Sequence, residues 1–181
     1  MSNYTKIPIG KNFPNDLYAI IEISAQSTPI KYEKNQKYDL LMVDRFIPTS
    51  IFYPCNYGYI NQTLSLDNDT LDILIITTYP LNSNVIIRCR PIGVLNMEDE
   101  KGKDEKIIAV PHSSLTKEYQ NIQDISHLSE FFKKKIIHFF TTYKNLEKNK
   151  WTKKIKLENL QKAHSIIISA HTRYQKKNKK I

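Results

Sequence analysis

A change of hydrophobic periodicity along the chain constrains the fold most: the first two thirds have the patterns of strands, and the last third those of helices. Short β-prone runs occupy residues 17–23, 38–43, 71–77, 84–97 and 106–110. The run at 71–77 is continuous and rich in branched side chains, which is typical of a strand buried on both faces. Pro91 and Gly93 interrupt the longest run and predict a bend or bulge. The run at 106–110 follows a polar turn around Gly102, so we expect it to pair back on the preceding strand as a hairpin.

The last third predicts two amphipathic helices. In the first, apolar residues recur at helical spacing from Leu128, and Ser126 is the expected N-cap. This stripe consists of Phe131, Phe132, Ile136, Phe139, Phe140, Tyr143 and Leu146. The second stripe runs through Leu157, Leu160, Ala163, Ile167 and Ala170. Many short strands followed by two helices predict an α+β domain with a small barrel or curled sheet at its centre.

The length of 181 residues suits a single domain with a sizeable core. We expect this domain to span residues 1–173, followed by a basic, mobile tail at residues 174–181. The net charge of +9 arises in the C-terminal segment, because residues 148–181 hold 11 basic residues and one acidic residue, whereas residues 1–147 hold 16 and 17. A solvated terminus explains this charge, and non-specific contact with polyanions is the alternative.

The cysteine count and the apolar runs exclude several classes of protein. Two cysteines, Cys55 and Cys89, cannot form a disulfide framework or a four-thiolate metal site, and we expect both in the core. No apolar run approaches the roughly 18 residues of a membrane span. The first ten residues lack the apolar stretch of a secretory signal. These features predict a soluble protein of a reducing compartment.

The densest chemical signal is a group of three aspartates, Asp67, Asp69 and Asp72, within six positions at the start of the strand predicted at 71–77. Residues two apart in an extended loop can point the same way, so the first two carboxylates can converge. Like charges at this density repel unless a cation neutralises them. All-oxygen ligands favour Mg²⁺, Mn²⁺ or Ca²⁺ over zinc. A polar turn with solvated acids is the alternative.

A second acidic cluster lies at residues 98–105, between two predicted strands. Two such clusters at the ends of adjacent strands indicate a site for several metal ions, which polarise a phosphoryl group and activate water. The chain also offers Lys31, Arg45, Lys106 and Lys144, with the tyrosines of residues 52–59, as ligands for an anion. Spacing alone does not show that these groups converge, and each of them taken singly is more often a surface charge or a core tyrosine.

An ordered series of motifs makes the chain similar to a known family. The acidic group has the form D-x-D-x-x-D, and the other matching segments are residues 30–33, 43–46, 52–60, 87–91, 99–104, 110–112, 138–140 and 143–144. In this order they resemble the soluble family I inorganic pyrophosphatases of the bacterial type, over roughly residues 6–165. The resemblance implies a small closed five-stranded OB-like β-barrel flanked by helices. It also implies Mg²⁺-dependent hydrolysis of pyrophosphate to two phosphates, with several ions per site, in a cytoplasmic homohexamer.

The resemblance assigns a role to fifteen residues. It implies that Asp69 accepts a proton from the attacking water. It implies metal ligands, or acids that shape the metal sites, at Asp67, Asp72, Asp99, Asp104, Glu22, Glu33 and Glu100. It implies phosphate-binding groups at Lys31, Arg45, Tyr53, Tyr57, Lys106, Tyr143 and Lys144.

The chain departs from the family pattern inside the acidic loop, where Asn68 and Thr70 replace the usual Gly and Pro. Asn tolerates positive φ, so we expect the turn to survive. Thr lacks the fixed φ of proline, which reduces preorganisation. Two other functions stay open: an OB-like module that binds nucleic acid without catalysis, and a metal-dependent phosphatase for larger phosphate esters. The first is disfavoured because five aspartates on a barrel face would repel a phosphate backbone, which leaves at most weak contact through the basic tail.

Overall fold

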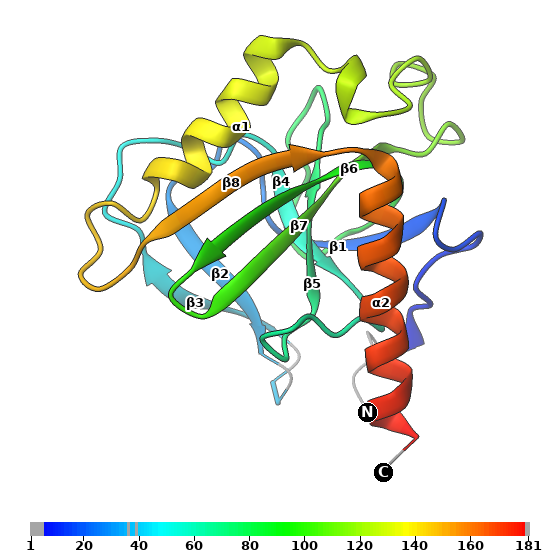
Figure 1. Cartoon of the computed structure of the whole chain (residues 1–181), viewed down its shortest axis with the longest axis horizontal. Coiled ribbons are helices and arrows are strands. Elements are labelled where there is room, and N and C mark those ends of the chain that lie inside the picture. The colour runs from blue at the N-terminus through cyan, green and yellow to red at the C-terminus, as the bar shows by residue number, and fades with distance from the viewer. Residues whose placement is uncertain (1–5, 36, 39, 180–181) are drawn as a thin grey trace.

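The computed structural model describes residues 6–35, 37–38 and 40–179 of the chain. In chain order its elements are β1 (Leu17–Ile23), β2 (Ile30–Asn35), β3 (Leu40–Phe46), β4 (Asn56–Ile60), β5 (Leu71–Ile75), β6 (Ile86–Asp99), β7 (Gly102–Pro111), the short 3₁₀ helix η2 (Ile125–His127), α1 (Glu130–Thr142), β8 (Thr152–Glu158) and α2 (Leu160–Asn178). Figure 1 shows α1 and α2 on different sides of a curled sheet.

Five strands close into a ring. The sheet order is β1-β4-β5-β7-β6-β8, and β6 also pairs back with β1 through Leu17↔Cys89 and the three pairs that follow. All pairings in the ring are antiparallel except β5 with β7, which is parallel. β8 extends the sheet beyond β6, and β2 with β3 forms a separate hairpin. This ring confirms the predicted α+β fold with a small barrel-like sheet.

The long strand β6 bends where the sequence predicts it to bend. Its pairing with β7 shifts register between Pro91 and Gly93, as in a β-bulge. The half before the bulge pairs with β1 and the half after it with β8, so the bend lets one strand serve two neighbours. A side chain at Gly93 would place its Cβ 2.7 Å from the carbonyl oxygen of Glu158, so only glycine permits this approach of the β8 end.

Both faces of the sheet are buried, as the continuous apolar run of β5 predicts. Alternating residues point to opposite faces: Ile73 packs in a cluster with α2 residues such as Ile167, whereas Leu74 packs in a second cluster with Phe139 and Phe140 of α1. Cys55 and Cys89 are free and buried, one in each cluster, which confirms their expected place in the core. Asp72 shares the face of Leu74, so the acidic end of β5 opens toward α1.

The boundaries of several predicted elements were wrong. The strand expected at 38–43 begins at Leu40 and runs to Phe46, and Asp39 lies outside the described residues. The hairpin partner β2 was not predicted. The first helix is capped by Ser129 instead of Ser126, because residues 125–127 form the 3₁₀ turn η2 capped by Asp124. Phe131 and Leu146 of the expected stripe are 79% and 76% exposed, so the buried stripe is shorter than predicted.

The second helical stripe also differs from the prediction at its start and its end. Leu157 belongs to β8, a strand that the periodicity did not reveal, and α2 begins at Leu160. The expected tail is helical as far as Asn178, and residues 180–181 lie outside the described part of the chain. Among the described residues, no helix has the length and apolar character that crossing a bilayer requires.

Candidate active site

A cavity of about 620 Å³ opens at the end of the ring that faces the β2–β3 hairpin and the end of α1. We call it the basin. Its acidic lining residues are Glu22, Glu33, Asp44, Asp67, Asp69, Asp72, Asp99, Glu100, Asp104 and Glu105; its basic ones are Lys31, Lys34, Arg45, Lys101, Lys103, Lys106, Lys144 and Lys150. Tyr53, Tyr57, Tyr59, Tyr143, Tyr174 and Phe140 add aromatic walls. The structure therefore brings all fifteen residues singled out by the resemblance into one cavity, while their individual roles stay predictions.

The ring topology explains why these residues meet. Tyr57, Asp72 and Lys106 stand on β4, β5 and β7, which are neighbours in the sheet, and Asp72 is the register partner of Lys106. Asp104 precedes Lys106 by two positions on β7, so both side chains lie on the same face of the strand. Most of the remaining groups come from β1, the β2–β3 hairpin, the loop before β5, the β6–β7 turn and the C-terminal end of α1. Tyr53 comes from the segment before β4, and Tyr174 from α2.

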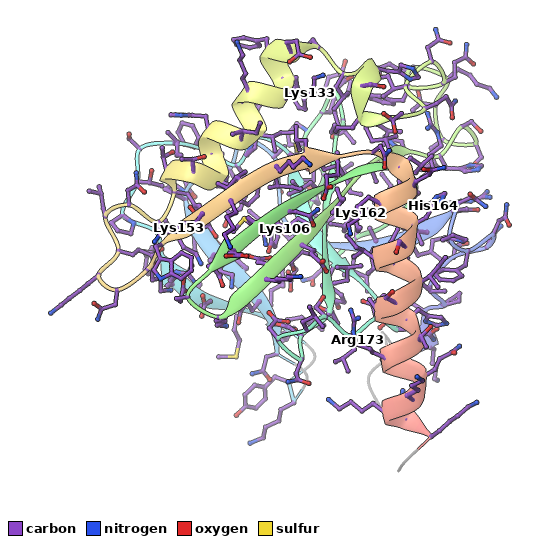
Figure 2. All side chains as sticks on the ribbon, in the orientation of Figure 1. Lys106, Lys133, Lys153, Lys162, His164 and Arg173 are labelled. Carbon is purple, nitrogen blue, oxygen red and sulfur yellow. The ribbon has the colours of Figure 1, made fainter. Side chains whose placement is uncertain are left out.

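Lys106 is the central cation of the basin. Its side chain is only 3% exposed, and Nζ lies 2.6 Å from Asp72 Oδ2 and 2.7 Å from Asp104 Oδ1. The same ammonium is 3.3 Å from the Tyr57 hydroxyl, which itself donates to Asp72. Burial alone would lower the pKa of Lys106, but Asp104 and Asp72 raise it well above its ordinary value. Lys106 is therefore a fixed positive charge. Figure 2 shows it on β7 among the strands of the ring.

Lys144 is a second buried lysine of the basin, and its ammonium contacts the β6–β7 turn. Its buried Nζ lies 2.8 Å from Asp99 Oδ2 and 3.1 Å from Glu100 Oε2. Burial alone would raise the pKa of Asp99, but the hydrogen bond from Lys144 makes the net shift downward. Against the effect of burial, the pKa of Glu100 is also lowered, first by a hydrogen bond from its own backbone N–H and then by Lys144. Both carboxylates are therefore charged at neutral pH. Gly102, at φ +118°, supplies the left-handed residue that the tight turn needs.

The acidic loop, residues 65–70, carries Asp67 and Asp69 over the start of β5. Ser65 N–H donates to the carbonyl oxygen of Asp69 at 2.7 Å, which closes the loop. Asn68 adopts φ +70°, so the turn survives without glycine as expected. Asp67 Oδ1 accepts from the Asp69 N–H at 3.1 Å. The pKa of Asp69 is raised, first by burial and then by the neighbouring charges of Asp72 and Asp67.

Glu22 is a buried acid of the basin. It is 7% exposed and accepts a 2.8 Å hydrogen bond from the Lys34 N–H. Burial, with the charge of Asp72, raises the pKa of Glu22 from 4.5 to about 8. A carboxylate kept in such a place gains most from a nearby cation, since that cation offsets the cost of its buried charge.

Arg45 has a partner that the sequence did not indicate. Its Nε lies 2.8 Å from Glu147 Oε2, and the Glu147 side chain is 9% exposed. Burial would lower the pKa of Arg45, but Glu147 raises it. Phe140, Lys150 and Tyr174 were also missed as basin residues. The sequence predicts Phe140 in the core stripe of the first helix and Tyr174 in a mobile tail, so neither local pattern indicates a residue of the basin.

The donor set of the basin suits hard divalent cations. It consists of carboxylate oxygens, which Mg²⁺ and similar ions prefer. In the described residues no three Asp, Glu, His or Cys side chains yet stand close enough to hold one ion. Instead, the Lys106 ammonium lies between carboxylates of β5 and β7, and the Lys144 ammonium lies against two adjacent carboxylates of the β6–β7 turn. The residues present therefore fit the expected ions in chemical type and in excess negative charge.

Comparison with known proteins gives consistent matches. The sequence profile of the family described as inorganic pyrophosphatase matches residues 19–175. An inorganic pyrophosphatase of Buchnera aphidicola subsp. Acyrthosiphon pisum is 57% identical over 174 residues, which cover 96% of each chain. The inorganic pyrophosphatase of Escherichia coli strain K12 is 52% identical over 171 residues, covering 94% of this chain and 97% of that one. A crystal structure of an inorganic phosphatase from Anaplasma phagocytophilum superposes with a TM-score of 0.91 at 40% identity, covering 94% of this chain and 99% of the other.

Proposed function

The chain belongs to the inorganic pyrophosphatase family, and on that premise we propose that the basin hydrolyses inorganic pyrophosphate to two orthophosphates with the help of Mg²⁺. The observation that supports this reaction most directly is the convergence of the two aspartate groups and the buried cations in one cavity. Hydrolysis of a small polyanion asks mainly for positioning and for neutralisation of charge, and the basin has groups for both.

The cations of the basin bind and orient the substrate. Arg45 offers a forked donor for a phosphoryl oxygen, and Lys31 offers a point charge. The ammonium groups of Lys106 and Lys144 lie beside carboxylates that hold them in place, so a phosphoryl oxygen entering the basin meets preorganised positive groups. The hydroxyls of Tyr53, Tyr57 and Tyr143 are further donors.

The carboxylates hold the ions. Asp67, Asp72, Asp99 and Asp104 are the proposed ligands of Mg²⁺, and Glu22, Glu33 and Glu100 shape the space around them. Bound Mg²⁺ supplies positive charge that polarises the phosphoryl group and makes water more acidic. Asp72 and Asp104 would hold the ion with their carboxylate oxygens, and Lys106, which now contacts both, would then be available to bind a phosphoryl oxygen.

Asp69 accepts the proton of the attacking water. The water oxygen forms a bond to one phosphorus, the bond from that phosphorus to the bridging oxygen breaks, and the second phosphate leaves with the bridging oxygen. The proton passes to the Asp69 carboxylate, which lies in the basin on the acidic loop. A general base at such a position contributes about 10²–10⁴-fold in rate.

The test is release of phosphate by the purified chain. With millimolar Mg²⁺ the protein is expected to convert pyrophosphate to phosphate, and EDTA to abolish the activity. Absence of phosphate release from folded protein would refute the proposed reaction. Parallel assays with nucleoside triphosphates and phosphomonoesters test the phosphatase alternative, which predicts faster turnover of those esters. The Mg²⁺ preference, the cytoplasmic location and the homohexamer implied by the resemblance remain parts of this proposal.

A further inference from the structure

The last two turns of α2 contribute no buried residue to the core. The buried residues of the helix are Ala163, Ile166, Ile167 and Ala170. Among the described residues after Ala170, none is buried, yet the helix continues to Asn178. The His171 ring packs against Phe13, with the ring centroids 5.1 Å apart. Among the described residues, the hydrogen bonds from these turns to the body are directed at one segment, residues 62–64.

Residues 62–64 lead directly into the acidic loop. Leu64 is held twice by α2: its N–H donates to the carbonyl oxygen of Ala170 at 3.0 Å, and its carbonyl oxygen accepts from Arg173 Nε at 2.7 Å. Two residues before Arg173, His171 Nδ1 lies 2.7 Å from the carbonyl oxygen of Gln62, so this nitrogen carries the proton and donates. Figure 2 shows Arg173 on the lower part of α2, and Figure 1 places this part of the helix beside the loop before β5.

The held segment connects directly to the catalytic carboxylates. Ser65, which follows Leu64, closes the acidic loop through its N–H to the carbonyl oxygen of Asp69 and its own carbonyl oxygen, which accepts from the Asn68 N–H at 3.3 Å. Thr63, which precedes Leu64, accepts the N–H of Leu71 at 2.9 Å on its Oγ1. Both ends of the acidic loop therefore depend on the residues beside Leu64.

We propose that Arg173 is a positioning residue that holds the acidic loop in place through Leu64. The guanidinium is always charged, and a hydrogen bond from a charged donor to a carbonyl is stronger than a neutral one. The loop contains Thr70, whose φ is free, so it depends on outside contacts for its shape. Arg173 touches neither substrate nor reacting atoms. It acts by fixing where the loop carboxylates stand when ions and water arrive.

The inference rests on the proposed function, because it assigns the acidic loop to metal binding and proton transfer. It predicts that loosening the loop weakens Mg²⁺ binding and lowers kcat. The cations that hold pyrophosphate stand on β2, β3, β7 and the end of α1, away from the loop, so KM for pyrophosphate should hardly change.

The experiment compares Arg173→Met with wild type on the full chain. Methionine keeps the aliphatic stem and removes the donor. Calorimetric titration of substrate-free protein with Mg²⁺ is expected to show a dissociation constant raised about tenfold, which corresponds to the loss of one charge-assisted hydrogen bond. At saturating Mg²⁺ we expect kcat to fall by about tenfold and KM to stay within about twofold.

Two further variants separate positioning from general stability. Lys177→Met removes an exposed charge one turn further along α2 and should behave as wild type. Arg173→Lys keeps a long cationic donor and should lie between wild type and Arg173→Met. Folded Arg173→Met with wild-type Mg²⁺ affinity and kcat would overturn the proposal, as would an equal loss in Lys177→Met. If Arg173→Met does not fold, Arg173→Lys decides, and wild-type Mg²⁺ affinity in it would also overturn the proposal.

The same experiment distinguishes the two levels of inference. If wild-type protein binds Mg²⁺ but releases no phosphate from pyrophosphate, the proposed function is wrong, while the calorimetric comparison still tests Arg173. If wild type is active and the variant binds Mg²⁺ equally well, only the positioning role is wrong.

Discussion

At the scale of single residues, the basin balances ten acidic side chains against eight basic ones, and the balance is local. Lys106 stands between Asp72 and Asp104, and Lys144 between Asp99 and Glu100. Each ammonium thereby joins carboxylates that a divalent ion would otherwise have to neutralise. A site of this kind keeps these carboxylates close together before any ion binds, at the cost of burying two lysines.

The first prediction concerns Lys106→Met. Without divalent ions the variant leaves Asp72 and Asp104 facing each other without a cation, so its free energy of unfolding should fall by roughly 2–4 kcal/mol, moderated because both carboxylates are partly exposed. Mg²⁺ should restore more stability to the variant than it adds to wild type, since the ion replaces the missing charge. Denaturant unfolding with and without Mg²⁺, at equal protein concentration, measures both effects.

A control for this prediction is Lys117→Met, which removes an exposed lysine away from the basin and should change neither quantity. An equal loss of stability in Lys106→Met with and without Mg²⁺ would show that the ion does not bind beside these carboxylates.

The second prediction concerns Asp69→Asn. The amide keeps the shape of the side chain but cannot accept the proton of the attacking water, so kcat should fall by about 10²–10⁴-fold. The unfolding midpoint should hardly change, because the loop is held by backbone hydrogen bonds of Ser65. Glu130→Gln, at an exposed position at the start of α1, is the matched control with unchanged activity. Full turnover in Asp69→Asn would show that Asp69 does not accept the proton of the attacking water.

At the scale of elements, the sequence predicts strongly patterned segments well and charged edge strands badly. The buried strands β1, β5 and β6 have long apolar runs, and their existence was predicted. β8 alternates lysines with only two apolar residues, Ile155 and Leu157, and such charged strands protect sheet edges from further pairing. Because Leu157 lies three residues before Leu160, it fits the helical period, and the pattern wrongly predicts it as part of the second helix.

The candidate site shows the same division between local and non-local information. The two aspartate groups are visible as local clusters, and their metal-binding chemistry follows from residue type. The meeting of Tyr57, Asp72 and Lys106 depends on pairings among β4, β5 and β7, which no local pattern encodes. Only the ordered family motifs linked these segments. The Arg45 partner Glu147 had no local signal, because a single glutamate in a charged turn is unremarkable in sequence.

The third prediction concerns Asp124, which connects two elements. Its carboxylate accepts the Ser126 N–H at 2.9 Å, which caps η2, and the Leu160 N–H at 2.8 Å at the start of α2. Asp124→Ala should lower the free energy of unfolding by about 1 kcal/mol, the usual cost of losing a cap. Asp124→Asn keeps an acceptor and should lose less. Equilibrium unfolding of the three proteins gives the comparison.

The pH dependence of this cap has a definite sign. Burial alone would raise the pKa of Asp124, but the hydrogen bonds from Ser126 and Leu160 lower it below 3.8 in the folded chain. A lowered folded-state pKa adds stability that is complete above the unfolded value and is lost as the pH falls through the folded value. The gap between wild type and Asp124→Asn should therefore close in acid. A gap that widens below pH 3.8 would contradict this account.

At the scale of the whole molecule, one hairpin is held against the body by contacts such as Arg45 with Glu147 and Tyr32 with the core. The β2–β3 hairpin forms a two-stranded sheet apart from the ring, and it carries Lys31, Glu33 and Arg45 into the basin. Phe46 and Leu40 on β3 are 74% and 62% exposed. An isolated hairpin is marginally stable in water, so this one depends on contacts with the rest of the protein to hold the substrate-binding cations in place.

The fourth prediction is that the chain assembles into the homohexamer implied by its family resemblance, and that assembly supports this hairpin. Sedimentation velocity should give a particle of six times the chain mass of 21.2 kDa. Dilution that dissociates the particle should lower activity together with the hexamer fraction, because the hairpin cations lose their support. Activity measured at each concentration of the dilution series provides the comparison. A single chain that retains full turnover would show that the ring and its helices alone hold the hairpin in position, and the link between assembly and catalysis would then be wrong.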